Sequence, residues 1–152
     1  MDNARELVDR FYVCCTRLDG LYYMAARKLG VKDNALALLY LLYDGKPHSQ
    51  KQIAEELLIP KTTINTIVKE YMDAGYLTLT PVHGSREKGL SLTQEGFEYA
   101  SKTVKPVYQA EDDAMVETLK EYPPEFIEAV EALTRNLALA FQREVFEQGK
   151  ES

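Results

Sequence analysis

The chain has 152 residues, 45% of them hydrophobic, and this size and content suit one domain with an ordinary core. The net charge of −6 excludes a uniformly basic surface of the kind that binds any polyanion. The charge is uneven, however. Residues 94–152 hold thirteen acids and six bases, whereas residues 45–93 hold five acids and six bases.

Targeting and membrane segments are not expected. The sequence Met-Asp-Asn-Ala-Arg-Glu at the start has neither a basic leader nor an apolar core, and no run of eighteen apolar residues occurs. We therefore expect a cytoplasmic protein without a membrane partner. The two cysteines, Cys14 and Cys15, are adjacent and do not form a framework of stapling disulfides.

Two helices are predicted before residue 44. Residues 4–30 carry apolar side chains at helical spacing over a wide face, and Gly30 ends the pattern. This face is wider than one contact requires, so we expect it to pack against both its own core and a second subunit. Residues 34–43 are apolar on nearly all sides and are expected beneath the elements that follow.

Residues 49–74 predict two helices joined by a sharp break. Ser49 suits an N-cap, because its hydroxyl can accept from the amides of the first turn. The first helix stops near Leu58, where Ile59-Pro60 interrupts it, since proline lacks an amide hydrogen and disfavours a helical residue before it. A second helix begins near Lys61 and buries the stripe Ile64, Ile67, Val68 and Tyr71.

The other face of this second helix carries short polar side chains and one ammonium group, from Thr62, Asn65, Thr66 and Lys69. An arbitrary polar stripe is more often a solvated surface. On the second helix of a helix-turn-helix, however, such donors and acceptors suit the base edges of the DNA major groove.

A hairpin follows Gly75, which is expected to cap the helix with a positive φ. Leucines alternate with polar residues in residues 77–80 and again in residues 90–93. The loop between them carries Arg86 and Lys88, which could reach a DNA backbone or minor groove. A solvated turn is the competing interpretation, because charged tips also protect edge strands.

The remaining chain predicts two more helices. One begins with Thr-Gln-Glu-Gly at Thr93, and the other covers residues 124–148 after the break at Tyr122-Pro123-Pro124. In a single domain the last helix and the first have no third layer to pack on. A twofold-related copy of the chain would supply one.

Four segments resemble the core of the MarR family of winged-helix transcription regulators. They are Ile-Ala-Glu-Glu-Leu (53–57), Thr-Thr-Ile-Asn-Thr-Ile-Val (62–68), Ala-Gly-Tyr-Leu (74–77) and Ser-Leu-Thr-Gln-Glu-Gly (91–96). The resemblance implies a mainly α protein with a small β-wing: a winged helix-turn-helix of six helices and a two-stranded hairpin, with a helical dimerisation region from both termini. It assigns residues 1–34 to an N-terminal dimerisation helix, 35–93 to the DNA-binding lobe and 94–152 to C-terminal helices that complete the dimerisation region.

Members of that family are dimers that bind pseudo-palindromic operators and are usually released by a small ligand or by oxidation. The resemblance therefore implies a homodimeric, sequence-specific regulator of transcription, a repressor, that binds double-stranded DNA and is released by a small aromatic inducer. The expected DNA contacts come from the first helix of the motif, from the second helix and from the wing: Ser49, Gln50, Lys51, Lys61, Thr62, Thr63, Asn65, Thr66, Lys69, Arg86 and Lys88.

Two sensor sites are considered. Ligands in this family often lie between the dimerisation helices and the DNA-binding lobe, and the aromatic candidates for such a crevice are Phe11, Tyr12, Tyr22, Tyr23, Tyr40 and Tyr43. Core packing is the competing role for them. Cys14 or Cys15 could instead act as a redox sensor, as in some relatives, but both fit the apolar face of the first helix and packing is favoured.

An enzyme is not expected. The sequence has no glycine-rich phosphate loop and no nucleophile elbow, and its two histidines lie in predicted turns. Metal-ligand spacings such as His-x₃-His and Cys-x₂-Cys are missing as well, so neither a metal nor another cofactor is expected. The alternative from a different class is a winged helix that binds a protein partner instead of DNA. The net negative charge of the chain favours this alternative, and the polar stripe on the second helix of the motif counts against it.

Overall fold

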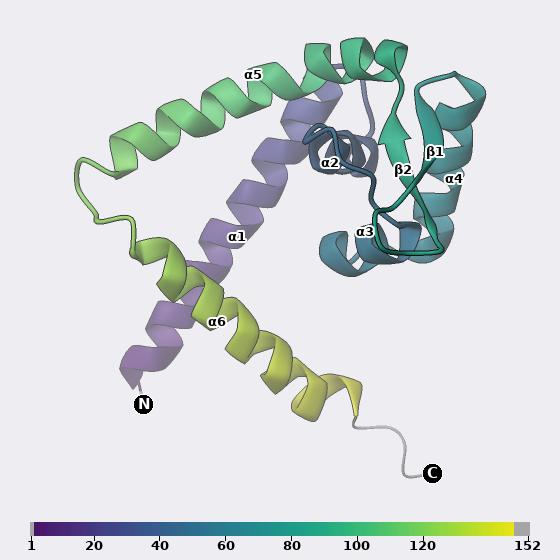
Figure 1. Ribbon diagram of the computed structural model, residues 1–152. Coiled ribbons are helices and arrows are strands. Elements are labelled where there is room, and N and C mark those ends of the chain that lie inside the picture. Colours follow the sequence, from purple (N-terminus) through teal and green to yellow (C-terminus); the bar gives the residue numbers. More distant parts are fainter. Residues whose placement is uncertain (1, 148–152) are drawn as a thin grey trace. The chain divides into compact units, whose positions relative to one another are not determined.

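The computed structural model describes residues 2–147, drawn in Figure 1. This range forms six α-helices, one antiparallel hairpin and a closing π-helical turn, which confirms the predicted winged helix-turn-helix. No helix in the described range is long and apolar enough to cross a membrane. The elements are α1 (Asp2–Lys28), α2 (Asp33–Leu42), α3 (Gln50–Leu57), α4 (Lys61–Asp73), β1 (Leu77–Pro81), β2 (Lys88–Leu92), α5 (Gln94–Thr118), α6 (Phe126–Phe141) and η1 (Gln142–Phe146).

The chain divides after Gln109 into two compact units, so that α5 begins in the first unit and ends in the second. The first unit therefore holds α1 and the start of α5 together with the winged helix, while the second holds the end of α5, α6 and η1. The division into a dimerisation helix, a DNA-binding lobe and C-terminal helices remains a prediction.

The core of the first unit is centred on α2. Leu38, Leu39 and Leu42 are fully buried, as expected for a helix that is apolar on nearly all sides. Ile53 of α3 and Ile64 of α4 are also fully buried in the same cluster. Full burial of one such side chain contributes about 1.5–3 kcal/mol, so these contacts hold both helices of the helix-turn-helix against α2.

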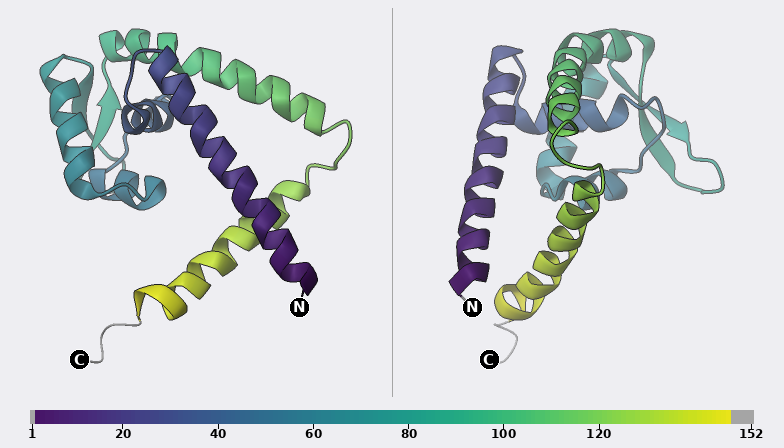
Figure 2. Two further views of the ribbon diagram at one scale, coloured as in Figure 1. Left: turned by 180° about the vertical axis from the view of Figure 1, so that it is seen from behind. Right: turned by 90° about the vertical axis from the view of Figure 1, so that its left-hand side faces the viewer.

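The hairpin pairs Leu77 with Leu92 and Pro81 with Lys88 across an antiparallel ladder. His48, in the segment that leads into α3, adds a bridge to Leu90 of β2. The side view in Figure 2 shows the hairpin projecting beyond the helices of the first unit. A projecting hairpin of this kind is the wing expected from the sequence.

Two of the four family-like segments meet where the hairpin joins the helices. Gly75 ends α4 with φ +79°, and its carbonyl accepts a 2.6 Å hydrogen bond from Thr93 Oγ1. The same hydroxyl accepts from the Gly96 amide at 2.9 Å and so caps α5, while the Thr93 amide donates to the Tyr76 carbonyl at 3.0 Å. A Cβ on Gly96 would lie 1.9 Å from that carbonyl oxygen. Only glycine therefore allows α5 to begin so close to the turn between α4 and β1.

Apolar helix surface remains exposed in both units. In the first unit, Ala26 near the end of α1 is buried with Leu36 and Val107, whereas side chains earlier in α1, such as Leu21 and Met24, are exposed. In the second unit, α6 has no buried residue among those described. The predicted last helix is confirmed, except that it ends in π-helical geometry over Gln142–Phe146.

Candidate nucleic-acid interface

The helix-turn-helix has a three-residue turn between its helices. α3 ends at Leu57, Leu58 adopts the left-handed conformation, and Pro60 stands before the first residue of α4. The Pro60 carbonyl accepts from the amides of Thr63 and Ile64 at 2.9 and 3.1 Å, which closes the first turn of α4. The predicted break at Ile59-Pro60 is confirmed, and its cause is the missing amide hydrogen of proline.

The two faces of α4, the second helix of the helix-turn-helix, differ in burial as the sequence predicts. Ile64, Ile67, Val68 and Tyr71 are buried, and burial together with the hydrogen-bonded Tyr99 raises the pKa of the Tyr71 phenol, which stays neutral. The polar stripe is open to solvent at Thr62, Asn65, Thr66 and Lys69.

The donors and acceptors of this stripe are available to a ligand. The Thr66 hydroxyl donates to the Thr62 carbonyl at 3.0 Å, which leaves its oxygen to act as an acceptor. Lys61 is exposed beside the stripe, and Thr63 is half-buried. Asn65 can offer both an amide donor and a carbonyl acceptor to a base edge.

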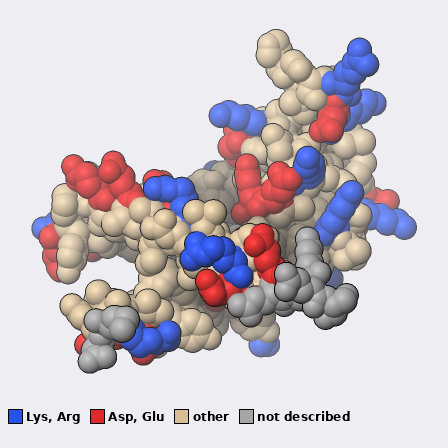
Figure 3. All heavy atoms as spheres, turned by 90° about the horizontal axis from the view of Figure 1, so that it is seen from below, with Lys and Arg blue, Asp and Glu red and all other residues tan. Residues whose placement is uncertain are grey.

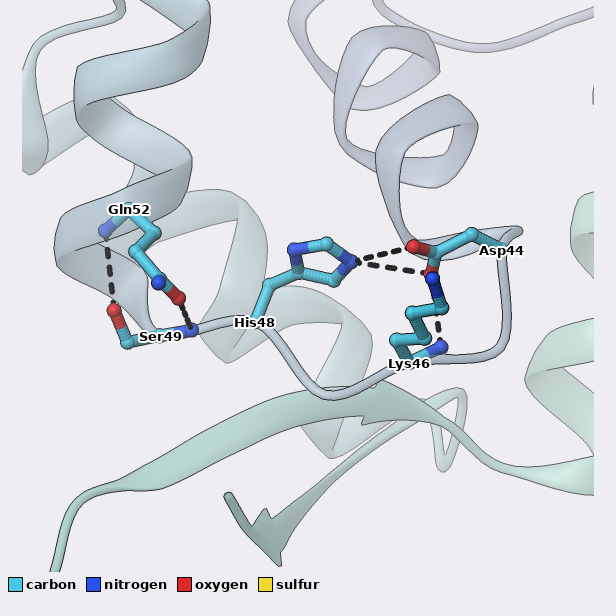
Figure 4. Close-up of polar contacts among 5 residues, drawn as sticks. All are labelled: Asp44, Lys46, His48, Ser49 and Gln52. Atoms are coloured by element: carbon cyan, nitrogen blue, oxygen red, sulfur yellow. Dashed lines mark hydrogen bonds and ion pairs between the residues drawn. The ribbon is translucent and has the colours of Figure 1, made fainter. Parts of the chain in front are cut away.

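The start of α3 is closed by a capping box. Ser49 Oγ accepts from the Gln52 amide at 3.1 Å, and the Gln52 side chain accepts from the Ser49 amide at 3.1 Å (Figure 4). The Ser49 side chain is therefore buried and engaged within the helix terminus, while Gln50 is half-buried. Lys51 is directed to solvent and lies 3.9 Å from Glu55 of the same helix.

A hydrogen-bonded contact between two side chains holds the segment before this cap. His48 Nε2 lies 3.1 and 3.0 Å from the two carboxylate oxygens of Asp44, one of which also accepts from the Lys46 amide at 2.8 Å (Figure 4). Burial by itself would raise the pKa of Asp44, but the Lys46 hydrogen bond and the His48 contact outweigh it and lower the pKa. Because His48 also pairs with Leu90, this contact connects the wing to the start of α3.

The wing tip presents its two cations to solvent. Arg86 and Lys88 are exposed, and the turn between the strands is closed by a 3.1 Å bond from the Ser85 amide to the Val82 carbonyl. The Glu87 amide donates to Ser85 Oγ at 3.1 Å. The turn is thus held by its own hydrogen bonds while both cations remain directed outward.

Charges are mixed over this lobe. The upper right of Figure 3, where the winged helix lies, shows Lys and Arg side chains with some acidic ones between them. No acid belongs to the polar stripe of α4, whose neighbouring acids Glu70 and Asp73 lie toward the end of the helix. This face of α4 is therefore neutral to basic although the chain is acidic.

The aromatic candidates for a ligand site divide into two groups. On α1, Tyr12, Tyr22 and Tyr23 are exposed and Phe11 is half-buried. On α2, Tyr43 stacks on Phe97 of α5 with centroids 4.8 Å apart, and Tyr40 meets Tyr108 edge-on at 4.8 Å. The structure thus brings the α2 tyrosines together with α5 inside the first unit, and their role as a ligand site stays a prediction.

The cysteines are free thiols with unequal exposure. Cys14 is exposed and Cys15 is half-buried on α1. Neither the packing role nor the redox role is tested by this geometry.

Sequence reasoning missed two features of this lobe. The Asp44–His48 contact has the i, i+4 spacing of a carboxylate and an imidazole, but here it spans a turn rather than a helix. The second feature is Leu58, whose left-handed backbone and exposed side chain no local pattern indicated.

Comparison with known proteins agrees with this architecture. The model of the MarR family matches residues 29–86, from the end of α1 to the wing tip. No curated protein has a matching sequence.

Several solved structures share the fold. A MarR family regulator from Neisseria meningitidis superposes with a TM-score of 0.71 at 21% identity, covering 97% of this chain and 99% of that one. The regulator MarR from Oenococcus oeni gives 0.67 at 15% identity over 87% and 98% of the two chains. NadR, solved in complex with 4-hydroxyphenylacetate, gives 0.64 at 19% identity over 84% and 89%. Residues 29–86 thus match the MarR family in sequence, and the chain shares the winged helix-turn-helix fold of these solved structures.

Proposed function

We propose that this protein binds a pseudo-palindromic DNA operator as a homodimer and represses transcription until a small aromatic ligand releases it. The observation that carries the proposal is the division of α4 into a buried apolar face and an exposed stripe of Thr62, Asn65, Thr66 and Lys69. In helix-turn-helix proteins the N-terminal residues of the second helix contact base edges in the major groove. The first helix crosses the backbone, which gives Lys51 and the start of α3 a role at phosphates.

The proposed dimer is supported by apolar surface that one chain leaves open. On α1, Leu18, Leu21 and Met24 are 53%, 62% and 66% exposed. α6 exposes a second apolar set that includes Leu139 at 63%. Monomeric proteins seldom expose contiguous apolar helix faces of this length, and a twofold interface would bury the same faces on both subunits.

The inducer class is proposed from the aromatic residues and from one relative. Tyr40, Tyr43 and Tyr108 bring phenol rings together between α2 and α5, and such rings combine apolar faces with hydroxyl groups. NadR, which shares the fold, was solved with 4-hydroxyphenylacetate. A ligand of this class would release DNA only by preferring the dimer geometry whose recognition helices miss successive major grooves.

Fluorescence anisotropy tests the DNA-binding proposal. Labelled DNA from upstream of the protein's own gene is titrated against scrambled DNA of the same composition at two salt concentrations. We expect tight, salt-sensitive binding to the upstream DNA and weak binding to the scrambled DNA. Adding 4-hydroxyphenylacetate to the complex then tests release.

Two variants localise the contact. Asn65→Ala should reduce operator affinity about 5- to 100-fold, the effect of losing a bidentate base contact, and should leave binding to scrambled DNA nearly unchanged. Asn136→Ala makes the same change on an exposed part of α6 and should leave both affinities intact. Equal losses on the two DNAs would remove Asn65 from base recognition. A wild-type protein that ignores both DNAs but retains a protein partner would favour the docking alternative.

A further inference from the structure

Leu58 combines two unfavourable features in the turn between α3 and α4. It is the one residue other than glycine within the described range that has a positive φ, with φ 50° and ψ 34°. Left-handed backbone is disfavoured for a branched side chain, and helices usually place glycine or asparagine there. The Leu58 side chain is also 88% exposed, more than any other large hydrophobic residue of the described chain.

The surroundings of Leu58 suggest what covers it. The turn borders an open cleft of about 540 Å³ whose lining includes Ala54, Ile59 and Pro60. Lys51 and Lys61 line the same cleft, and its single carboxylate, Glu55, lies 3.9 Å from Lys51 Nζ. An apolar projection flanked by two ammonium groups is complementary to a polyanion that also offers an apolar group.

DNA has that combination in its major groove. Lys61, the first residue of α4, follows Leu58 by three positions, so Leu58 precedes the helix end that is proposed to enter the groove. The 5-methyl group of thymine is the apolar feature among the base edges of the major groove. The side chains of Lys51 and Lys61 are longer and charged, so they suit phosphates on either side, which leaves the shorter leucine for the base edge.

We propose that Leu58 is a specificity-determining residue that packs against the 5-methyl group of a thymine in each operator half-site. This inference rests on the proposed DNA-binding function. Strained and exposed residues persist where function requires them, and here both features are explained by one contact. The polar stripe of α4 reads hydrogen-bonding edges, and Leu58 adds a contact that recognises only the methyl group.

Replacing thymine by deoxyuridine removes only that methyl group, and this provides a direct test. Each thymine of the operator is replaced in turn, and affinities are measured by anisotropy for the wild type, Leu58→Asn and Leu58→Gly. When deoxyuridine replaces one particular thymine of each half-site, the affinity of the wild type should fall about fourfold, as expected for one buried methyl group. The affinity of both variants should not change at that replacement. Leu119→Asn, which changes an exposed leucine in the second unit, should keep the wild-type response.

Asparagine and glycine both accept left-handed backbone, so the variants should fold. Their urea midpoints should equal or exceed that of the wild type, which separates loss of contact from loss of structure. If no thymine distinguishes the wild type from the variants, the inference is overturned. It is also overturned if the variants weaken operator and scrambled DNA equally, since that result indicates packing on sugar and phosphate. A wild type that prefers no operator would overturn the proposed function together with this inference.

Discussion

Substituting Gly96 by alanine tests the close contact between the start of α5 and the turn that connects α4 to β1. The added Cβ would lie 1.9 Å from the Tyr76 carbonyl oxygen, 2.7 Å from the Tyr76 carbonyl carbon and 3.0 Å from its Cα, all of them backbone atoms. The start of α5 must therefore move by more than about 1 Å to reach ordinary van der Waals separation. That movement strains the hydrogen bonds that Thr93 makes to Gly75 and Tyr76.

The expected cost follows from these contacts. Overpacking costs about 1–3 kcal/mol, each weakened hydrogen bond about 1 kcal/mol, and the better helix propensity of alanine returns about 1 kcal/mol. The net loss is about 2–4 kcal/mol, a large part of the usual stability of a domain. With an m-value of about 1–3 kcal/mol/M in urea, the unfolding midpoint should fall by about 0.7–4 M.

Urea unfolding followed by circular dichroism measures this loss. The protein concentration is held fixed, because the stability of the proposed dimer depends on it. Gly20→Ala is the matched control. Gly20 lies within α1 with nothing within 4 Å of the added Cβ, so alanine there should stabilise the protein by about 0.5–1 kcal/mol. A Gly96→Ala midpoint at or above that of the wild type would refute the assignment of Gly96 to a close backbone contact.

Three further outcomes follow from the same structure. Arg86→Ala should weaken operator and scrambled DNA alike and reduce the salt slope by about one per protomer, and an unchanged slope would remove Arg86 from the interface. Asp44→Asn should destabilise the protein by under about 1 kcal/mol, because the side chain is more than a third exposed. Folding lowers the Asp44 pKa below its ordinary value of 3.8, so this contribution is present above 3.8 and is lost as the pH falls through the lowered pKa of the folded state. In thermal unfolding, the difference between wild type and variant should therefore be largest near neutral pH and shrink as the pH is lowered below 3.8. Leu21→Glu, at an exposed apolar position of α1, should shift the protein from dimer to monomer in sedimentation velocity, and a persistent dimer would place the interface elsewhere.

Local chemistry in the sequence determined most of the helix-turn-helix. The spacing of Ile64, Ile67, Val68 and Tyr71 predicted which face of α4 is buried, and the structure buries all four. The cap at Ser49 and the break at Pro60 were predicted because they depend only on a side-chain hydroxyl and a missing amide hydrogen within one turn. By exclusion, the same periodicity left Asn65 and Lys69 on the exposed stripe.

Tertiary structure alone decided the features that join distant segments. Thr93 and Gly96 were read as a helix start, yet the need for glycine comes from the Tyr76 carbonyl, which lies twenty residues earlier in the chain. The exposure of Leu58 likewise depends on how α3 and α4 pack on α2, because helical spacing assigns a residue to a face but says nothing of what covers that face. Periodicity encodes contacts within one helix or strand, whereas close approach between elements is set by the packing of the whole core.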